Sequence, residues 1–587
     1  MEELLDFLHG EYSFPILTFI LQGAGAVLVL SLLVIFFYDR YIQHENQLLI
    51  NYPLIGRLRY VFYAMRDPMR QYFGDENFYD SFDKVKWVYN AAENKGLVSS
   101  FSPGQPLHGP RLAIKNANLV LNEEQIDEPF SVTFGRGARV PFTTRSVLGR
   151  SAMSDGSISP EGTRAFAWGA YLGQFPINTG EGSLTSNFLM THRYDPKNCA
   201  YLQAKRGTLF ARGVYRVMRM LFNPAIANRV YRHMVLEPKE EETYLLDPKT
   251  LACYRVDWDA PLDAFPETVP EDLPDIIFQI GSGLFGVRDG EGQFDPERYK
   301  KVMRFCRMTE IKLAQGAKQT GGKLLGEKVT DAIAYYRGVE PFKDIFAPNR
   351  FPYAQTLEEL FDFLGELKRL SEKPVGIKIV LSSSEAFEPY AQLIRQRLET
   401  GSEAYPDFIT VDGADGGSGA APLDMMMSVG MTLHKALYIV DKSLREIGAR
   451  ENVKVIASEK VLTPDDATLL LALGADYVAM ARAFMMTVGC IRARECSGAN
   501  GRHCPVGLAT QDKKKRASFL VEQKAHRMAN YHRHMCEGIR GLMAIMGVRT
   551  LSELWHRNLA FKDFTGKSYS DIYAFLHPNA GYGILRF

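Results

Sequence analysis

Eight short apolar runs, each followed by glycine, serine or another loop-forming residue, constrain the fold of this chain most. Strand-like runs that alternate with helical or loop segments are typical of βα units, and eight such units predict a (β/α)8 TIM barrel. The runs are SVLGRSAMS, FPINTG, DIIFQIGS, EIKLAQG, VGIKIVLS, DFITVDG, VKVIASE and ADYVAMA, between residues 146 and 481. Functional residues of such barrels lie at the carboxyl ends of the strands, so the polar residues that end these runs are the candidate site.

An uncharged segment precedes the runs. No charged residue lies between Tyr12 and Tyr38, and an apolar helix of this length can cross a bilayer about 30 Å thick. The acidic start and the lack of a small-residue cleavage site argue against a secretory signal. Arginines after the segment place the rest of the chain on the cytoplasmic or organelle-matrix side. We therefore predict a single-pass membrane protein, with a buried core helix as the alternative.

Composition excludes some classes of protein. Lys and Arg total 69 against 68 Asp and Glu, so no basic excess indicates a nucleic-acid partner. The 7 cysteines are too scattered in so long a chain to resemble the paired framework of a small secreted domain. A reducing compartment is therefore expected.

The predicted domains are an anchor (1–45), an irregular cap (46–144), the barrel (145–512) and a helical tail (513–587). Between the second and third runs lies an insertion, about residues 184–274, that is too long for an ordinary loop. Part of it alternates arginines with apolar residues at near-helical spacing. This pattern favours a helix pair packed on the barrel, or else a membrane-surface or partner-binding face.

Two lysines lie in and just after the fourth run. Lys312 ends the strand, and Lys318 lies in the glycine-rich loop beyond it. Two cations at this spacing suit a dicarboxylate or a phosphate, and a solvated basic loop is the alternative.

A second glycine-rich segment, DGADGGSGAAP, begins at Asp412, the end of the sixth run's apolar part. Its backbone N–H groups could cradle a phosphate, or its glycines could flank a flat ring. Glu181, after the second run, is the carboxylate best placed to donate or accept a proton. An ordinary surface position is the alternative reading of Glu181.

Three cysteines, Cys490, Cys496 and Cys504, follow the last run. Their spacing matches neither the CxxC pairs of structural zinc nor the common ferredoxin pattern. From spacing alone they are either ligands or ordinary core residues.

Taken together, the motifs resemble the FMN-binding synthase domain of glutamate synthase, and more closely its stand-alone, membrane-anchored relatives. The resemblance spans roughly residues 145 to 512, with the motifs in the family's order. The motifs are AMSDGSIS, NTGEG, IFQIGSGLFGV, EIKLAQGAKQTGGKLLGEKV, DGADGGSGAAP, GADYVAMARAFM and CPVGLATQ.

The resemblance implies that reduced FMN gives a hydride to 2-iminoglutarate, formed from 2-oxoglutarate and ammonia, to yield glutamate. The residues that would hold the keto-dicarboxylate are Lys312, Lys318 and Arg337, with Glu181 managing protons. The residues that would line FMN are Met153, Ser154, Gln279, Lys378, Gly416 and Gly417, with the phosphate near Ser458 and Ala481. Cys490, Cys496 and Cys504 match ligands of a 3Fe–4S cluster in the family.

The chain also departs from the family. Seven residues separate Cys496 from Cys504, more than is usual. Glu459 replaces a glycine expected at the phosphate, and Asp155 in MSDG is a second acidic change expected near the cofactor. No glutaminase nucleophile or nicotinamide fingerprint is present, so free ammonia and a carrier such as ferredoxin or quinone are expected.

Two further hypotheses remain open. One is a barrel that has lost catalysis and acts as a structural or assembly subunit of a membrane protein complex. The other is a flavin enzyme for a different 2-oxo or amino acid.

Overall fold

The structure, a computed structural model, forms two compact units, Met1–Phe82 and Asp83–Phe587. It describes residues 13–43, 49, 52–58, 82–98, 112–126, 130–189, 202–238, 240–241, 244–248, 250–256, 269, 273–316, 322–414, 416, 425, 428–492, 496–497, 504, 506–516 and 519–561. The boundary between the units falls inside the predicted cap, so the limits of the cap stay a prediction.

The first unit is built on helix α2 (Ser13–Phe37), which continues as a π-helical turn, Tyr38–Ile42. Within it, Gln22–Ile42 is long and apolar enough to cross a membrane, with a mean hydropathy of 1.8. Membrane anchors and signal sequences share this length and composition. Beyond the helix, Arg57 donates hydrogen bonds to Asp39 from Nε (2.9 Å) and Nη2 (2.6 Å), which joins residues 52–58 to the helix end.

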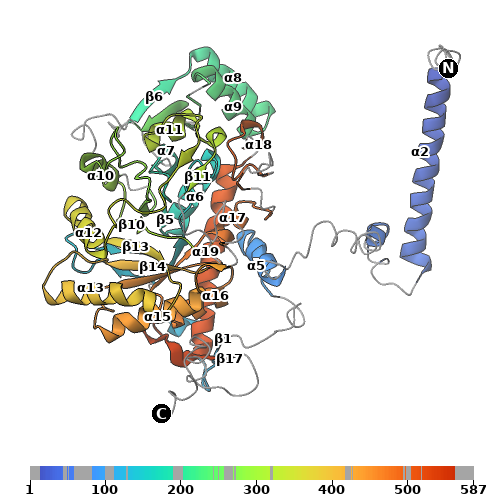
Figure 1. The fold of residues 1–587 in the computed structure, drawn as a ribbon. Coiled ribbons are helices and arrows are strands. Elements are labelled where there is room, and N and C mark those ends of the chain that lie inside the picture. Colours follow the sequence, from blue (N-terminus) through green and yellow to red (C-terminus); the bar gives the residue numbers. More distant parts are fainter. Residues whose placement is uncertain are drawn as a thin grey trace. The chain divides into compact units, whose positions relative to one another are not determined.

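The second unit is a closed barrel of parallel strands. Seven of the predicted runs each contain one strand, and the fourth run overlaps β10, which begins two residues before it. The strands are β4 (Leu148–Arg150), β5 (Ile177–Asn178), β9 (Ile276–Ile280), β10 (Met308–Lys312), β13 (Val375–Val380), β14 (Phe408–Asp412), β15 (Lys454–Ser458) and β16 (Tyr477–Met480). Most of their residues are buried because helices cover the outside of the barrel (Figure 1). The predicted (β/α)8 barrel is therefore confirmed.

Helices follow the strands in the alternating order that a barrel of βα units requires. The main ones are α6 (Pro160–Gly173), α10 (Pro296–Met303), α11 (Asp331–Arg337), α12 (Leu357–Ser371), α13 (Glu388–Glu399), α15 (Leu433–Glu446), α16 (Pro464–Ala472) and α17 (Arg482–Thr487). Their starts are encoded locally: Ser159 Oγ accepts a hydrogen bond from Gly162 N ahead of α6, and Thr463 and Asp466 form a capping box at α16.

Shorter helices and strands lie outside the eight barrel strands. They are α5 (Phe82–Ala92), β1 (Leu112–Ile114), β2 (Thr133–Phe134), β3 (Phe142–Thr143), α7 (Ser186–Leu189), β11 (Lys323–Leu324), β12 (Ile345–Phe346), α18 (Lys513–Arg516) and β17 (Leu559–Phe561). β1 pairs with β17, and the β2–β3 hairpin packs Phe134 against Phe408 and Tyr477. Much of the predicted cap that the structure describes thus contributes to the barrel's core.

The tail contains a long helix, α19 (Val521–Met546), that packs along α6. The helices approach closely at Gly169, where an added Cβ would lie 3.0 Å from Met528. The tail's last part, residues 562–587, lies outside the described residues.

His532 of α19 gives a testable pH dependence. It is buried, with Nε2 2.8 Å from Ser146 Oγ and its ring stacked on Phe175. Burial lowers the pKa of His532 from 6.5 to about 3. The unfolded state therefore binds more protons between these values, and stability is lost as pH falls below 6.5, by about 1.4 kcal/mol per pH unit.

In the unchanged protein, the urea concentration at the unfolding midpoint should fall between pH 7 and pH 5. We expect this fall to be smaller in His532→Gln, because glutamine does not titrate. The exposed control on the same helix, His526→Gln, should keep the profile of the unchanged protein. An unaltered pH slope in His532→Gln would contradict the assignment.

The insertion folds around its own small core. An antiparallel sheet has the order β6–β8–β7, with strands Leu202–Arg206, Ala252–Val256 and Leu245–Asp247. Helices α8 (Leu209–Leu221) and α9 (Pro224–Val235) pack on each other through Tyr215 and Tyr231. The arginine-rich pattern is thus a helix pair.

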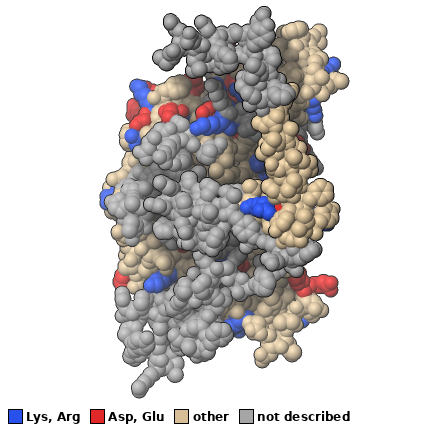
Figure 2. All heavy atoms as spheres, turned by 90° about the vertical axis from the view of Figure 1, so that its right-hand side faces the viewer, with Lys and Arg blue, Asp and Glu red and all other residues tan. Residues whose placement is uncertain are grey.

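The surface carries both signs of charge. Figure 2 shows one face of the molecule, the right-hand side of Figure 1. On the described part of this face, Lys and Arg are scattered among Asp and Glu. The balanced composition is therefore matched by mixed charges on this face.

Candidate functional site

The rim of the barrel carries an ion pair between two predicted site residues. Lys312 ends β10, Glu181 follows β5, and Lys312 Nζ lies 3.1 Å from Glu181 Oε1. Gly281, after β9, makes room for this carboxylate, because an added Cβ there would lie 2.5 Å from Glu181 Oε2. The structure thus brings a cation and a candidate proton carrier together where the strands end.

Arg337 supplies a second positive charge beside this pair. It ends α11, is buried, and donates a hydrogen bond from Nη2 to the Asp155 carbonyl (2.9 Å). Burial lowers the pKa of Arg337 to about 10, while the carboxylates of Glu181 and Asp155 oppose the shift. The guanidinium is therefore charged at neutral pH. Its Nε is buried without a hydrogen-bond partner among the described residues.

A buried carboxylate inside the barrel was missed from the sequence. Glu310 Oε1 accepts hydrogen bonds from Gln279 Nε2 (2.6 Å) and Asn178 Nδ2 (2.9 Å), and Oε2 accepts one from the Thr410 hydroxyl. Side chains alternate along a strand, so Glu310 and Lys312 share one face of β10. The two-residue spacing between Glu310 and Lys312 was the feature of the sequence that could have identified Glu310 as a site residue. The network fixes the amide of Gln279, a predicted cofactor residue.

A second buried cluster joins side chains from β13, β14 and β15 and from the loop after β4. Lys378 Nζ lies 3.3 Å from Asp412 Oδ2 and donates a hydrogen bond to Ser458 Oγ (3.4 Å). Ser458 Oγ is 3.3 Å from Ser151 Oγ, just beyond β4. Two predicted cofactor residues, Lys378 and Ser458, therefore contact each other.

The glycine loops after β10 and β14 lie backbone to backbone. An added Cβ on Gly316 would lie 1.8 Å from the Gly413 carbonyl and 2.6 Å from Gly416 N. Only glycine permits so close an approach. Asp412 Oδ2 accepts a hydrogen bond from Gly316 N (3.1 Å) and holds the two loops together.

The other predicted cofactor residues are placed as follows. Arg150 Nη1 donates to the Met153 carbonyl (3.2 Å), and Ser154 packs on Gly180, where an added Cβ would lie 2.7 Å from Ser154 Oγ. Ala481 directly precedes α17. Lys318 and Gly417 lie outside the described residues.

Asp155 and Glu459, the two acidic residues that depart from the family pattern, have hydrogen-bond partners within the protein. Asp155 is buried and accepts hydrogen bonds from Thr185 Oγ1 (2.6 Å) and Asn187 Nδ2 (2.7 Å). Glu459 Oε2 accepts one from Leu433 N (3.1 Å), at the start of α15. Asp155 therefore has a structural role in the loop after β4, and its proximity to the cofactor stays a prediction.

We expect Asp155→Ala to lower the free energy of unfolding by about 3 kcal/mol, because buried donors lose their acceptor. Asp155→Asn retains an acceptor oxygen and should cost less. Chemical unfolding followed by tryptophan fluorescence measures both variants, and equal losses would contradict this account.

The three cysteines lie near one another and near Lys328. The Lys328 ammonium donates a hydrogen bond to the Cys496 carbonyl (2.6 Å). Burial lowers the pKa of Lys328, while Cys496 and Cys504 oppose the shift. Burial raises the pKa of Cys490, as does nearby Cys504. Among the described residues, however, no three His, Cys, Asp or Glu side chains are grouped so that they could hold a metal ion. The 3Fe–4S site therefore stays a prediction.

Comparisons with known proteins give a consistent result. The family model described as the conserved region in glutamate synthase matches residues 116–549. The glutamate synthase large subunit-like protein YerD of Bacillus subtilis is 31% identical over 552 residues, which cover 86% of this chain and 88% of YerD. The archaeal-type glutamate synthase (NADPH) of Thermotoga maritima is 30% identical over 292 residues, 49% of this chain and 53% of that protein. The chain thus spans about half the length of that relative.

Among solved structures, the flavin-binding domain of baker's yeast flavocytochrome b2 is 11% identical and covers 82% of this chain and 81% of that one. Its TM-score is 0.38, a likeness that carries no functional inference.

Fold and site define a (β/α)8-barrel protein with a glycine-lined, polar site at the carboxyl ends of its strands. The family match covers most of the chain, and the chain belongs to the glutamate synthase family.

Proposed function

We propose that this protein is a membrane-anchored, FMN-dependent oxidoreductase that converts 2-oxoglutarate and ammonia to glutamate. The observation that carries the proposal is the Lys312–Glu181 ion pair beside the Arg337 guanidinium at the carboxyl face of the barrel. The relatives named glutamate synthase support the same reaction.

The rim residues suit a dianionic substrate. Lys312 would exchange Glu181 for one carboxylate of 2-oxoglutarate, with Arg337 and Lys318 supplying further positive charge. Glu181, released from Lys312, would then be free to move the protons that imine formation and reduction require. Because Lys312 and Glu181 come from different strands, a bound dianion would separate them without unfolding either element.

FMN, when bound, supplies the hydride that converts the imine carbon of 2-iminoglutarate to the amine carbon of glutamate. The residues proposed to hold FMN are Met153, Ser154, Gln279, Lys378, Gly416 and Gly417, with Ser458 and Ala481 near the phosphate. Two observations fit this group: the Lys378 cation is held at the strand ends, and the adjacent loops are glycine backbone without side chains.

The apolar helix α2 supports anchoring in a membrane, with the barrel on the cytoplasmic or matrix side. Electrons would come from a carrier such as ferredoxin or a membrane quinone. No step is assigned to an iron–sulfur cluster.

An absorption spectrum with FMN and iron quantification on detergent-purified full chain tests the proposal. A flavin band with about one FMN per chain, followed by reductive amination of 2-oxoglutarate with a reduced carrier, is expected. Absence of flavin overturns it. Flavin without amination of any 2-oxo acid favours a barrel that has lost catalysis, and a preference for another 2-oxo acid changes the substrate only.

A further inference from the structure

Helix α8 presents an apolar face that no described residue covers. Leu209, Phe210, Met220 and Leu221 are 80%, 74%, 86% and 69% exposed. Single exposed apolar side chains are ordinary on protein surfaces, but several on one helix mark an interaction surface.

This exposure does not come from a loosely placed helix. The opposite face of α8 buries Ala211 and Tyr215 against α9. Tyr215 donates a hydrogen bond to Asn228 Oδ1 (3.0 Å), and its ring lies 5.4 Å from that of Tyr231. One face of α8 is thus fixed in a core, and its orientation holds the other face in solvent.

The charged side chains of α8 and α9 themselves have one sign. Residues 202–236 contain no Asp or Glu. Arg216 and Arg219 on α8, and Arg229 on α9, are exposed beside the apolar side chains. An amphipathic helix with arginines flanking exposed Leu, Phe and Met residues is the pattern of helices that lie in the interface of an anionic membrane.

We propose that α8 docks in the plane of an anionic phospholipid bilayer, with Phe210 and Met220 in the acyl boundary and Arg216 and Arg219 at lipid phosphates. The inference rests on the anchored location proposed above, because α2 keeps a bilayer within reach and raises its effective concentration for α8. A soluble protein partner has no comparable support in the chain.

The insertion also contacts a helix of the candidate site. Arg255 of the inserted sheet lies over the ring of Tyr335 in α11, 5.0 Å from its centroid. The same helix ends at Arg337. The docked insertion therefore contacts the helix that carries Arg337.

The test uses full chain reconstituted in nanodiscs of phosphatidylcholine and phosphatidylglycerol that contain brominated lipids. Phe210→Trp places a fluorophore on the face. Val140→Trp is the matched control, an exposed apolar position in the hairpin loop that packs beside Pro374, just before β13 begins. The quenching of tryptophan fluorescence by the brominated lipids is compared with that in the unchanged protein, which has 4 tryptophans of its own. Incorporation into nanodiscs tests the anchor, and flavin content and amination on the same samples test the proposed function separately.

We expect the fluorescence contributed by Phe210→Trp to be quenched and that of Val140→Trp to be unaffected. Adding Arg216→Glu and Arg219→Glu, or omitting phosphatidylglycerol, should remove most of the quenching while α2 keeps the protein in the disc. Quenching no greater than in the Val140→Trp control overturns the proposal. Protection of Phe210→Trp from aqueous acrylamide in detergent, with a dimeric mass, also overturns it and assigns the face to a second copy.

Discussion

Lys312→Met is expected to lower kcat/KM for 2-oxoglutarate by about 10²- to 10³-fold, equivalent to about 3–4 kcal/mol. The ammonium of Lys312 is paired with Glu181 at the rim, and methionine keeps the length of the side chain but removes the charge that would hold the dianion. KM should rise more than kcat falls. Steady-state amination assays with a reduced artificial donor measure both constants.

The matched control is Lys300→Met, which removes a lysine on α10 that pairs only at the surface with Glu297. It should keep both constants and FMN content unchanged. If Lys312→Met binds FMN normally and keeps the KM of the unchanged protein, the assignment of Lys312 to the substrate is wrong.

Glu181→Gln separates proton transfer from binding. The variant keeps the shape of the side chain but cannot exchange a proton, so kcat should fall by about 10²- to 10⁴-fold with a small change in KM. A bell-shaped pH profile that persists unchanged in this variant would contradict the role.

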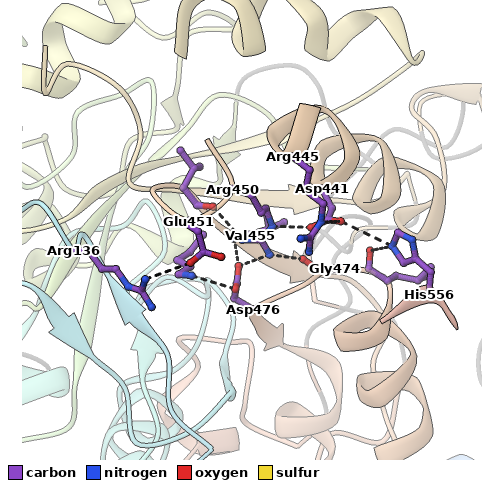
Figure 3. A network of polar contacts seen from close by, with 12 residues as sticks. Arg136, Asp441, Arg445, Arg450, Glu451, Val455, Gly474, Asp476 and His556 are labelled. Atoms are coloured by element: carbon purple, nitrogen blue, oxygen red, sulfur yellow. Dashed lines mark hydrogen bonds and ion pairs between the residues drawn. The ribbon is translucent and has the colours of Figure 1, made fainter. Parts of the chain in front are cut away.

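The largest effect on stability is expected from Arg450→Met, at the amino-terminal end of the barrel (Figure 3). Arg450 Nε lies 2.7 Å from Asp441 Oδ1, Nη2 lies 2.7 Å from Asp476 Oδ2, and Nη2 also donates to the Gly474 carbonyl (2.8 Å). Burial would lower the pKa of Arg450, but the two carboxylates raise it, so the group stays charged. Its loss leaves a carboxylate buried with less compensation, at a cost of about 3–5 kcal/mol.

Arg445→Met is a matched control, because Arg445 Nε lies 2.8 Å from Oδ2 of the same Asp441. Its side chain is 46% exposed against 10% for Arg450. Water replaces much of an exposed contact, so the loss should be about 1 kcal/mol or less. The midpoints of urea unfolding compare the two variants, and equal shifts would show that burial of Arg450 is not what matters.

The same network explains why segments far apart in sequence stay together. Arg136 of the β2–β3 hairpin reaches Glu451, and His556 of the tail reaches the Leu473 carbonyl (Figure 3). Asp476 also accepts a hydrogen bond from Val455 N (2.7 Å) and so fixes the start of β15. None of these partners is adjacent in sequence, and their pairing could not be read from spacing.

Much of the fold could be predicted from the sequence because strand content and turn chemistry are local properties. Each of the eight runs contains or overlaps one barrel strand, and the α2 segment and the α8–α9 pair follow the apolar and arginine patterns. The candidate site could be predicted for the same reason: Lys312 ends one strand, Glu181 follows another, and strand ends meet at one face of a barrel.

The rest depended on contacts between distant residues. Sequence by itself determined that Lys312, Glu181 and Arg337 belong to the candidate site, but only the tertiary structure paired Lys312 with Glu181, turned Asp155 toward Thr185 and Asn187, and placed Glu459 at the start of α15. It also decided which face of α8 is buried. Hydrogen-bond partners and burial depend on how the helices and loops pack, and residue type and spacing along one segment do not specify that packing.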